Sequence, residues 1–121
     1  MTTVYFYKNC DTCRKALKFL DANNVVYNKQ DLVLEAPPAR AELAQILREV
    51  AGGNVRSLFN TSGMMYREMQ LRDKLPAMSD DEALDLLAAN GKLIKRPLLV
   101  SARGGLIGFK PAEWERWLAS A

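Results

Sequence analysis

The 121-residue sequence has no histidine and only two cysteines, and this shortage limits the chemistry open to it. A zinc site needs about four ligands, usually cysteine or histidine, so a zinc site within one chain is not expected. The sequence also lacks an apolar run of membrane-spanning length, and no basic segment followed by an apolar stretch opens it. We therefore expect no membrane segment, no secretory signal and a cytoplasmic location, where thiols are kept reduced.

Neither sign of charge dominates, since 17 basic and 14 acidic residues give a net charge of +3. The basic residues are scattered, which permits an anionic substrate but predicts no direct nucleic-acid binding. The densest basic group is Lys92 with Lys95 and Arg96, interpreted on charge alone as a solvated helix end. The chain length and its 49% apolar content predict one domain, residues 1–121, with a sizeable core.

The two cysteines form one CxxC motif, Cys10-Asp11-Thr12-Cys13. Residues 4–7 before it are aromatic and partly β-branched, which predicts a strand, and apolar residues recur at helical spacing from Ala16 onward. A thiol at the first turn of a helix faces unpaired N–H groups and the positive end of the helix dipole, which favour thiolate. The second thiol lies about one turn away, within disulfide reach. The motif predicts a thiol–disulfide centre; two inert, buried cysteines are the alternative.

The next segments predict a parallel β-α-β unit followed by helices. Residues 25–27 begin a second strand after an Asn-Asn turn. Pro37-Pro38 opens a helix that Gly52-Gly53 ends. Residues 79–82 form a capping box for a later helix. The helical pattern persists to about residue 93, so we expect a helical insertion at about 36–93.

The end of the chain predicts a β-β-α unit. Residues 97–100 form a strand, Gly104-Gly105 a turn and residues 106–109 its hairpin partner. Pro111 starts the last helix. The whole order predicts an α/β fold with a four-stranded mixed sheet.

These features together resemble a thioredoxin-like fold, and with the helical insertion they resemble the arsenate reductase-like family that includes ArsC, Spx and MgsR. The resemblance covers essentially the whole chain. Four segments carry it: Tyr7–Ala16, Pro37-Pro38 with Glu42-Leu43, Phe59–Gly63 and Leu93–Pro97. Phe59–Gly63 resembles the CxxC-containing reductase-like branch more than Spx.

The resemblance implies roles for individual residues. Cys10 is the expected nucleophile, Cys13 the resolving thiol and Arg96 the group that stabilises an anion or thiolate. Pro97 is the expected cis-proline opposite the redox cysteine, which would turn Arg96 toward Cys10. Arg14 is a further candidate for binding the substrate, with an exposed helix charge as the alternative.

Glutaredoxin-linked arsenate reductases of this family hold their substrate with three arginines. Only Arg96 matches one of them here, while Asn60 and Lys110 occupy the other two positions and are site-lining candidates by position. A histidine near the nucleophile is also missing, with Lys8 in that region. Lysine cannot form the planar, bidentate clamp of guanidinium, so we expect negligible arsenate reduction.

The sequence thus predicts a cytoplasmic thiol–disulfide oxidoreductase that uses Cys10 and Cys13 and binds no cofactor. Glutathione or a thioredoxin or glutaredoxin system is the expected reductant. The expected substrate is a thiol or disulfide, or a small anion. The alternative is an Spx-like redox-sensing transcriptional regulator that binds RNA polymerase, and arsenate reduction ranks below both. The physiological substrate, the electron donor and the oligomeric state stay open.

Overall fold

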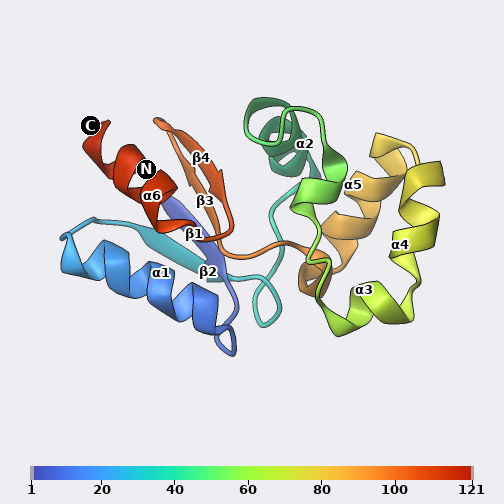
Figure 1. The fold of residues 1–121 in the computed structure, drawn as a ribbon, viewed down its shortest axis with the longest axis horizontal. Helices are drawn as coiled ribbons and strands as arrows, with labels where there is room; N and C mark the ends of the chain where they lie inside the picture. The colour runs from blue at the N-terminus through green and yellow to red at the C-terminus, as the bar shows by residue number, and fades with distance from the viewer. Residues whose placement is uncertain (1, 121) are drawn as a thin grey trace.

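A four-stranded mixed sheet organises the computed structural model, which describes residues 2–120 (Figure 1). The strands are β1 (Thr3–Phe6), β2 (Asn28–Asp31), β3 (Leu98–Ser101) and β4 (Gly104–Ile107). Their order in the sheet is β2-β1-β3-β4, with β1 and β2 parallel and the other two pairs antiparallel. This arrangement confirms the predicted α/β fold with a mixed sheet.

The helices divide into two groups (Figure 1). They are α1 (Asp11–Ala22), α2 (Arg40–Glu49), α3 (Met64–Glu68), α4 (Leu71–Lys74), α5 (Asp80–Ala89) and α6 (Pro111–Ala119), with short 3-10 helices η1 (Val55–Leu58), η2 (Leu75–Ala77) and η3 (Gly91–Leu93). Helices α1 and α6 lie beside the sheet, whereas α2 to α5 form a separate helical half. No helix within residues 2–120 is long and apolar enough to span a membrane.

The sheet separates two hydrophobic cores because side chains alternate along each strand. Val4 and Leu99 pack with α1 and α6, where Trp114 is fully buried. Tyr5 and Leu98 point into the other core, which the helical half completes. The β1 strand therefore anchors the start of α1, and with it the CxxC motif, between both cores.

The second strand starts later than predicted. The Val25 amide donates to the Leu20 carbonyl, so this residue still closes the end of α1. Val26 leaves 82% of its surface exposed, and the pairing with β1 begins only at Asn28, opposite Thr3. The β-branched residues at 25–26 reflect packing at the helix end and exposure, not strand pairing.

Two further boundaries differ from the predictions. The proline pair precedes α2 and does not open it, since Ala39 is the extended N-cap. A residue that stands before a proline, as Pro37 does, is disfavoured in the helical backbone conformation. The hairpin turn lies at residues 102–103, and Gly104 already belongs to β4 with φ of 108°. The capping box of Ser79 with Glu82 is confirmed.

Gly91 is required where the helical half meets the sheet half. A Cβ atom on Gly91 would lie 1.8 Å from the carbonyl oxygen of Leu32, the residue that follows β2. The Leu32 amide in turn donates to the Phe6 carbonyl at the end of β1. This joint leaves no room for a side chain at residue 91.

We predict that Gly91→Ala lowers the free energy of unfolding by about 1–3 kcal/mol, the usual cost of overpacking a tight contact. Urea unfolding followed by tryptophan fluorescence measures the change. An unchanged unfolding midpoint would show that the approach of Gly91 to Leu32 is looser than the structure has it.

Candidate active site

Cys10 caps the N-terminus of α1 with its own sulfur. Its backbone is extended, with φ of −114° and ψ of 114°, and its Sγ accepts a hydrogen bond from the Cys13 amide at 3.3 Å. Cys10 is half-buried, whereas Cys13 is fully buried, and both thiols are free. The CxxC segment therefore presents one accessible thiol and holds the second one beneath it.

The surroundings push the acidities of the two thiols apart. Partial burial alone would raise the pKa of Cys10, but hydrogen bonding from Cys13 and the nearby Arg96 guanidinium bring this pKa below its ordinary value. Burial, followed by the hydrogen bond to Cys10, raises the pKa of Cys13 to about 12. Thiolate character is thus concentrated on Cys10, the thiol that a substrate can reach.

Arg96 and Pro97 lie opposite the cysteines. The Arg96–Pro97 peptide bond is cis, as the resemblance implied. The Arg96 guanidinium lies 4.9 Å from the centre of the Tyr7 ring, a cation–π contact that holds the charge near the Cys10 loop. Pro97 is buried, and its carbonyl accepts a hydrogen bond from the Gly108 amide at 2.8 Å.

A cavity of about 380 Å³ lies over the Cys10 thiol. It brings together four of the predicted site residues: Cys10, Asn60, Arg96 and Lys110. Pro97 is next to the cavity in the chain, and buried Cys13 lies behind Cys10. Arg14 does not line the cavity; its exposed side chain pairs with Asp11 instead.

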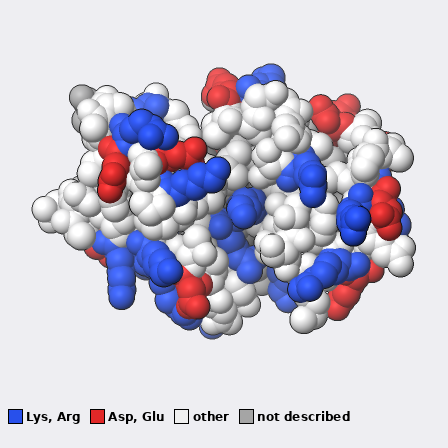
Figure 2. Space-filling view, in the orientation of Figure 1, with Lys and Arg blue, Asp and Glu red and all other residues white. Residues whose placement is uncertain are grey.

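Lys95 is a cavity residue that the sequence interpretation missed. It lines the cavity beside Arg96, whereas Lys92 is exposed outside the cavity. Both cavity residues follow the end of η3 at Leu93. Figure 2 shows basic side chains gathered in the hollow between the sheet half and the helical half. The hollow is therefore suited to anionic groups.

A short backbone pairing positions Lys95 and Arg96 near Cys10. Phe59 pairs with Ile94 in an isolated antiparallel bridge. The Lys95 amide donates to the Leu58 carbonyl and the Asn60 amide to the Leu93 carbonyl, both at 2.7 Å. Residues far apart in sequence thus meet on one wall of the cavity.

Asp31 fixes the loop before Cys10, and the sequence interpretation also missed it. Its carboxylate accepts hydrogen bonds from the amides of Lys8 at 3.2 Å, Val33 at 2.8 Å and Leu34 at 2.7 Å. The residue is only 4% exposed. The one sequence signal was an aspartate at a strand end, a common turn feature. We regard Asp31 as a positioning residue for the cysteine loop.

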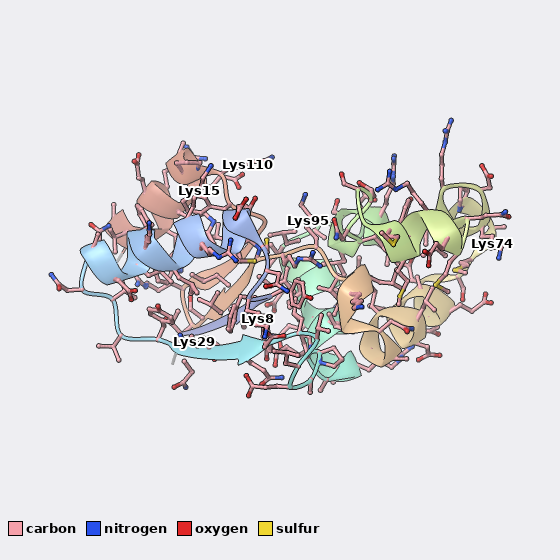
Figure 3. All side chains as sticks on the ribbon, turned by 90° about the horizontal axis from the view of Figure 1, so that it is seen from below. Lys8, Lys15, Lys29, Lys74, Lys95 and Lys110 are labelled. Atoms are coloured by element: carbon pink, nitrogen blue, oxygen red, sulfur yellow. The ribbon has the colours of Figure 1, made fainter. Side chains whose placement is uncertain are left out.

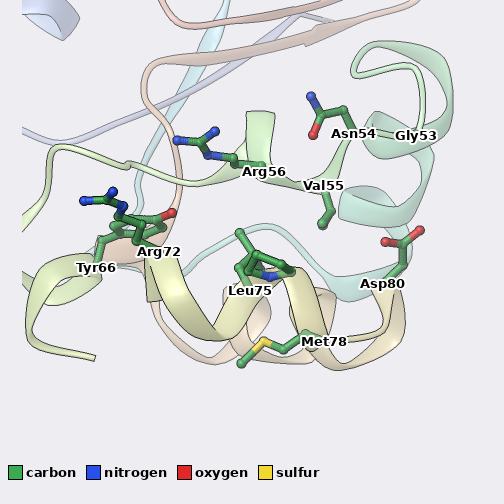
Figure 4. A pocket seen from close by; sticks show the side chains of 10 residues that line it. Gly53, Asn54, Val55, Arg56, Tyr66, Arg72, Leu75, Met78 and Asp80 are labelled. Carbon is green, nitrogen blue, oxygen red and sulfur yellow. The ribbon is translucent and has the colours of Figure 1, made fainter. Parts of the chain in front are cut away.

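A second cavity of about 440 Å³ lies within the helical half (Figure 4). Arg56, Tyr66 and Arg72 line it, and the two arginine side chains extend in the same direction (Figure 4). No cysteine lines this cavity, so it is separate from the thiol site. Within residues 2–120 no group of three or more metal-ligating side chains comes together.

The family assignment follows from comparison with known sequences. The sequence model of the ArsC family matches residues 5–117. The chain belongs to the ArsC family. Bacillus subtilis YusI is 45% identical over 93% of this chain and 94% of its own length. The regulatory protein MgsR of the same organism is 32% identical over 92% and 85%.

Solved structures agree with this assignment. The crystal structure of an ArsC-family-related protein from Bacteroides fragilis superposes with a TM-score of 0.86. It is 44% identical and covers 96% of each chain. The predicted resemblance to the ArsC, Spx and MgsR family is thereby confirmed.

We predict that Arg96→Ala raises the pKa of Cys10, because the guanidinium no longer favours the thiolate. The rate of Cys10 alkylation by iodoacetamide at pH 7 should fall roughly threefold, the effect of losing about 0.7 kcal/mol of charge stabilisation. The rate is measured against pH in the Cys13→Ser background. Arg48→Ala, on the exposed side of α2, is the matched control. Equal pH profiles for Arg96→Ala and Arg48→Ala would contradict the assigned role.

We predict that Asp31→Asn lowers the free energy of unfolding by about 1–3 kcal/mol at pH 7, since three amides lose a charged acceptor. Burial would raise the pKa of Asp31, but these amides bring it below its ordinary value. The stabilisation is therefore present above the unfolded pKa of about 3.9 and is lost as the pH falls through the folded pKa.

Urea unfolding from pH 7 down to pH 2 measures this dependence. The stability difference between the two proteins should shrink below about pH 4. Asp73→Asn, at an exposed residue of α4, serves as the control. A stability difference that stays constant with pH would show that the carboxylate charge is not what holds the loop.

Proposed function

We propose that this ArsC-family chain is a thiol–disulfide oxidoreductase. One observation carries the proposal: an accessible Cys10 of lowered pKa lies one helical turn from a buried Cys13, in a basic cavity. Cys10 is the nucleophile, Cys13 the resolving thiol, and Arg96 stabilises the thiolate. Asn60 and Lys110 form the substrate-binding wall, and Pro97 borders it beside Arg96.

The first step is attack of the Cys10 thiolate on one sulfur of a substrate disulfide. A bond forms between Cys10 Sγ and that sulfur, and the substrate S–S bond breaks. The other substrate sulfur leaves as a thiolate and takes a proton from water. Arg96 supports the attacking thiolate before the reaction, and the helix N-terminus stabilises the same charge.

The second step closes the intramolecular disulfide. Mixed-disulfide formation removes the Cys10 charge and the hydrogen bond that help to raise the pKa of Cys13. Cys13 gives its proton to water and attacks Cys10 Sγ, which releases the first substrate sulfur as a thiolate that is then protonated. Two electrons pass to the substrate, leaving two substrate thiols and the Cys10–Cys13 disulfide.

A cellular thiol then returns the protein to its dithiol form. Two glutathione molecules, or one thioredoxin- or glutaredoxin-type dithiol, supply the two electrons and are oxidised to a disulfide. The chemistry needs no bound cofactor and suits a reducing compartment such as the cytoplasm. Arsenate reduction is a weaker proposal, because the cavity provides only the Arg96 guanidinium beside Lys95 and Lys110.

A regulatory function is the second candidate, and the similarity to MgsR favours it. In that case the same Cys10–Cys13 pair would sense oxidants, and closure of the disulfide would change binding to a partner such as RNA polymerase. The two candidates share the thiol chemistry and differ in whether turnover occurs.

We predict that the purified protein catalyses reduction of bis(2-hydroxyethyl) disulfide by glutathione or by a thioredoxin system. Cys10→Ser should abolish turnover, whereas Cys13→Ser should accumulate a mixed disulfide on Cys10 that mass spectrometry detects. Arsenate, tested in parallel with glutaredoxin present, should give negligible turnover because two guanidinium contacts are missing.

Three outcomes would contradict this function. Full turnover by Cys10→Ser would remove Cys10 as nucleophile. Robust arsenate turnover would restore the arsenate reductase assignment. Absence of disulfide turnover, together with oxidation-dependent capture of RNA polymerase, would favour the regulator.

A further inference from the structure

The cavity over Cys10 continues into a neighbouring cavity of about 530 Å³, which is distinct from the cavity within the helical half. Lys95, Ile107 and Lys110 line both, so the two form one groove that leads away from the thiol. The distal part of this groove runs along β4, with Val50 and Ser57 of the helical half on its other side. A single small disulfide would leave most of the groove empty.

The groove exposes the free edge of the sheet. Strand β4 is the last in the order, and the Gly108 amide bonds to the Pro97 carbonyl of the β3 side. Because hydrogen-bonded positions alternate in an antiparallel pair, Leu106 faces β3 while Gly105 and Ile107 turn their backbone groups outward. Within residues 2–120, no hydrogen bond joins these outward groups to another residue. Both residues line the distal groove.

The groove carries an excess of positive charge. Lys95, Arg96 and Lys110 line it, against one carboxylate, Glu113. None of the three cations forms a salt bridge within the described part of the chain. Figure 3 shows Lys95 between the two halves of the molecule and Lys110 on the sheet half, while Lys74 lies far off in the helical half.

This proposal rests on the proposed function: we propose that the substrate is an extended, acidic polypeptide segment whose cysteine is held in a disulfide. The Cys10 thiolate attacks the sulfur of that cysteine, the substrate S–S bond breaks, and the other sulfur leaves as a thiolate that is then protonated. The segment adds to the β4 edge through the backbone groups of Gly105 and Ile107. Lys95 and Lys110 bind its carboxylates. Arg96 stays with the reacting sulfur atoms.

A single-turnover assay tests this substrate class in the full chain carrying Cys13→Ser. The probes are two seven-residue peptides, each with one cysteine activated as a disulfide with pyridine-2-thiol. In one peptide glutamates flank the cysteine on both sides, and in the other lysines do. Attack by Cys10 forms the peptide mixed disulfide and releases pyridine-2-thione, which is followed by absorbance. A small probe, the 2-hydroxyethyl pyridyl disulfide, reports the reactivity of Cys10 alone.

The glutamate peptide should react about tenfold faster than its lysine counterpart at low salt, because the groove attracts negative charge. Lys95→Gln and Lys110→Gln should each reduce this rate ratio about two- to fivefold, the size of one partly exposed ion pair. Lys74→Gln, at an exposed lysine away from the groove, should leave the ratio unchanged.

Backbone pairing is tested by amide hydrogen exchange in the peptide adduct. The amides of Gly105 and Ile107 should exchange about tenfold more slowly in the glutamate-peptide adduct than in the adduct of the small probe. Unchanged exchange of both amides would overturn the edge-strand docking.

The two proposals fail in different ways. If the small probe does not react with Cys10, the oxidoreductase function fails. If the small probe reacts while glutamate and lysine peptides react equally, the oxidoreductase function stands and the acidic-peptide substrate is overturned. If Lys74→Gln lowered the glutamate-to-lysine rate ratio as much as the groove variants do, the preference would come from the overall charge of the protein. That result would also overturn peptide binding in the groove.

Discussion

The hydrogen bond from the Cys13 amide to the Cys10 sulfur is the contact on which the site depends. It makes the thiol the N-cap of α1, a position where a side-chain acceptor normally satisfies a free amide. The same contact favours negative charge on Cys10 and places Cys13 one helical turn away, where burial raises the pKa of Cys13 and favours its protonated thiol. The two thiols of the motif are thus distinguished by one helix terminus.

The site also depends on how the two halves of the molecule are joined. The bridge between Phe59 and Ile94 holds the segment that carries Lys95 and Arg96, and Gly91 lets the chain approach β2 closely. Without these joints the cavity over Cys10 would lack one wall. The helical half therefore contributes charge and shape to a thiol that the sheet half positions.

The parts predicted well were those fixed by local signals. The CxxC motif lies between the predicted strand and helix because strand, cap and helix are all encoded within residues 3–22. The cis-proline and the approach of Arg96 to the cysteine came from family resemblance, since neither has a local signal. The family itself is now established by the ArsC match.

The predictions failed where contacts between distant segments determine an element boundary or the position of a site residue. Residues 25–27 have strand-forming composition, yet pairing with β1 starts after them. The two adjacent glycines at 104–105 led to a predicted hairpin turn two residues later than the actual turn. Asp31 and Lys95 acquire their positions from segments distant in sequence. No periodicity marks an aspartate whose partners are backbone amides, nor a lysine placed by a single bridge.

We propose that Cys10 and Cys13 act as one reversible dithiol pair, and a redox titration is the decisive test of that pairing. The full chain is equilibrated in glutathione buffers from reducing to oxidising, quenched by alkylation and analysed by mass spectrometry. A reversible dithiol pair should show a single loss of two hydrogens, mapped to a Cys10–Cys13 disulfide and restored by dithiothreitol. Stable glutathione adducts or sulfinic acid on Cys10, with Cys13 still a thiol and no intramolecular bond, would contradict it.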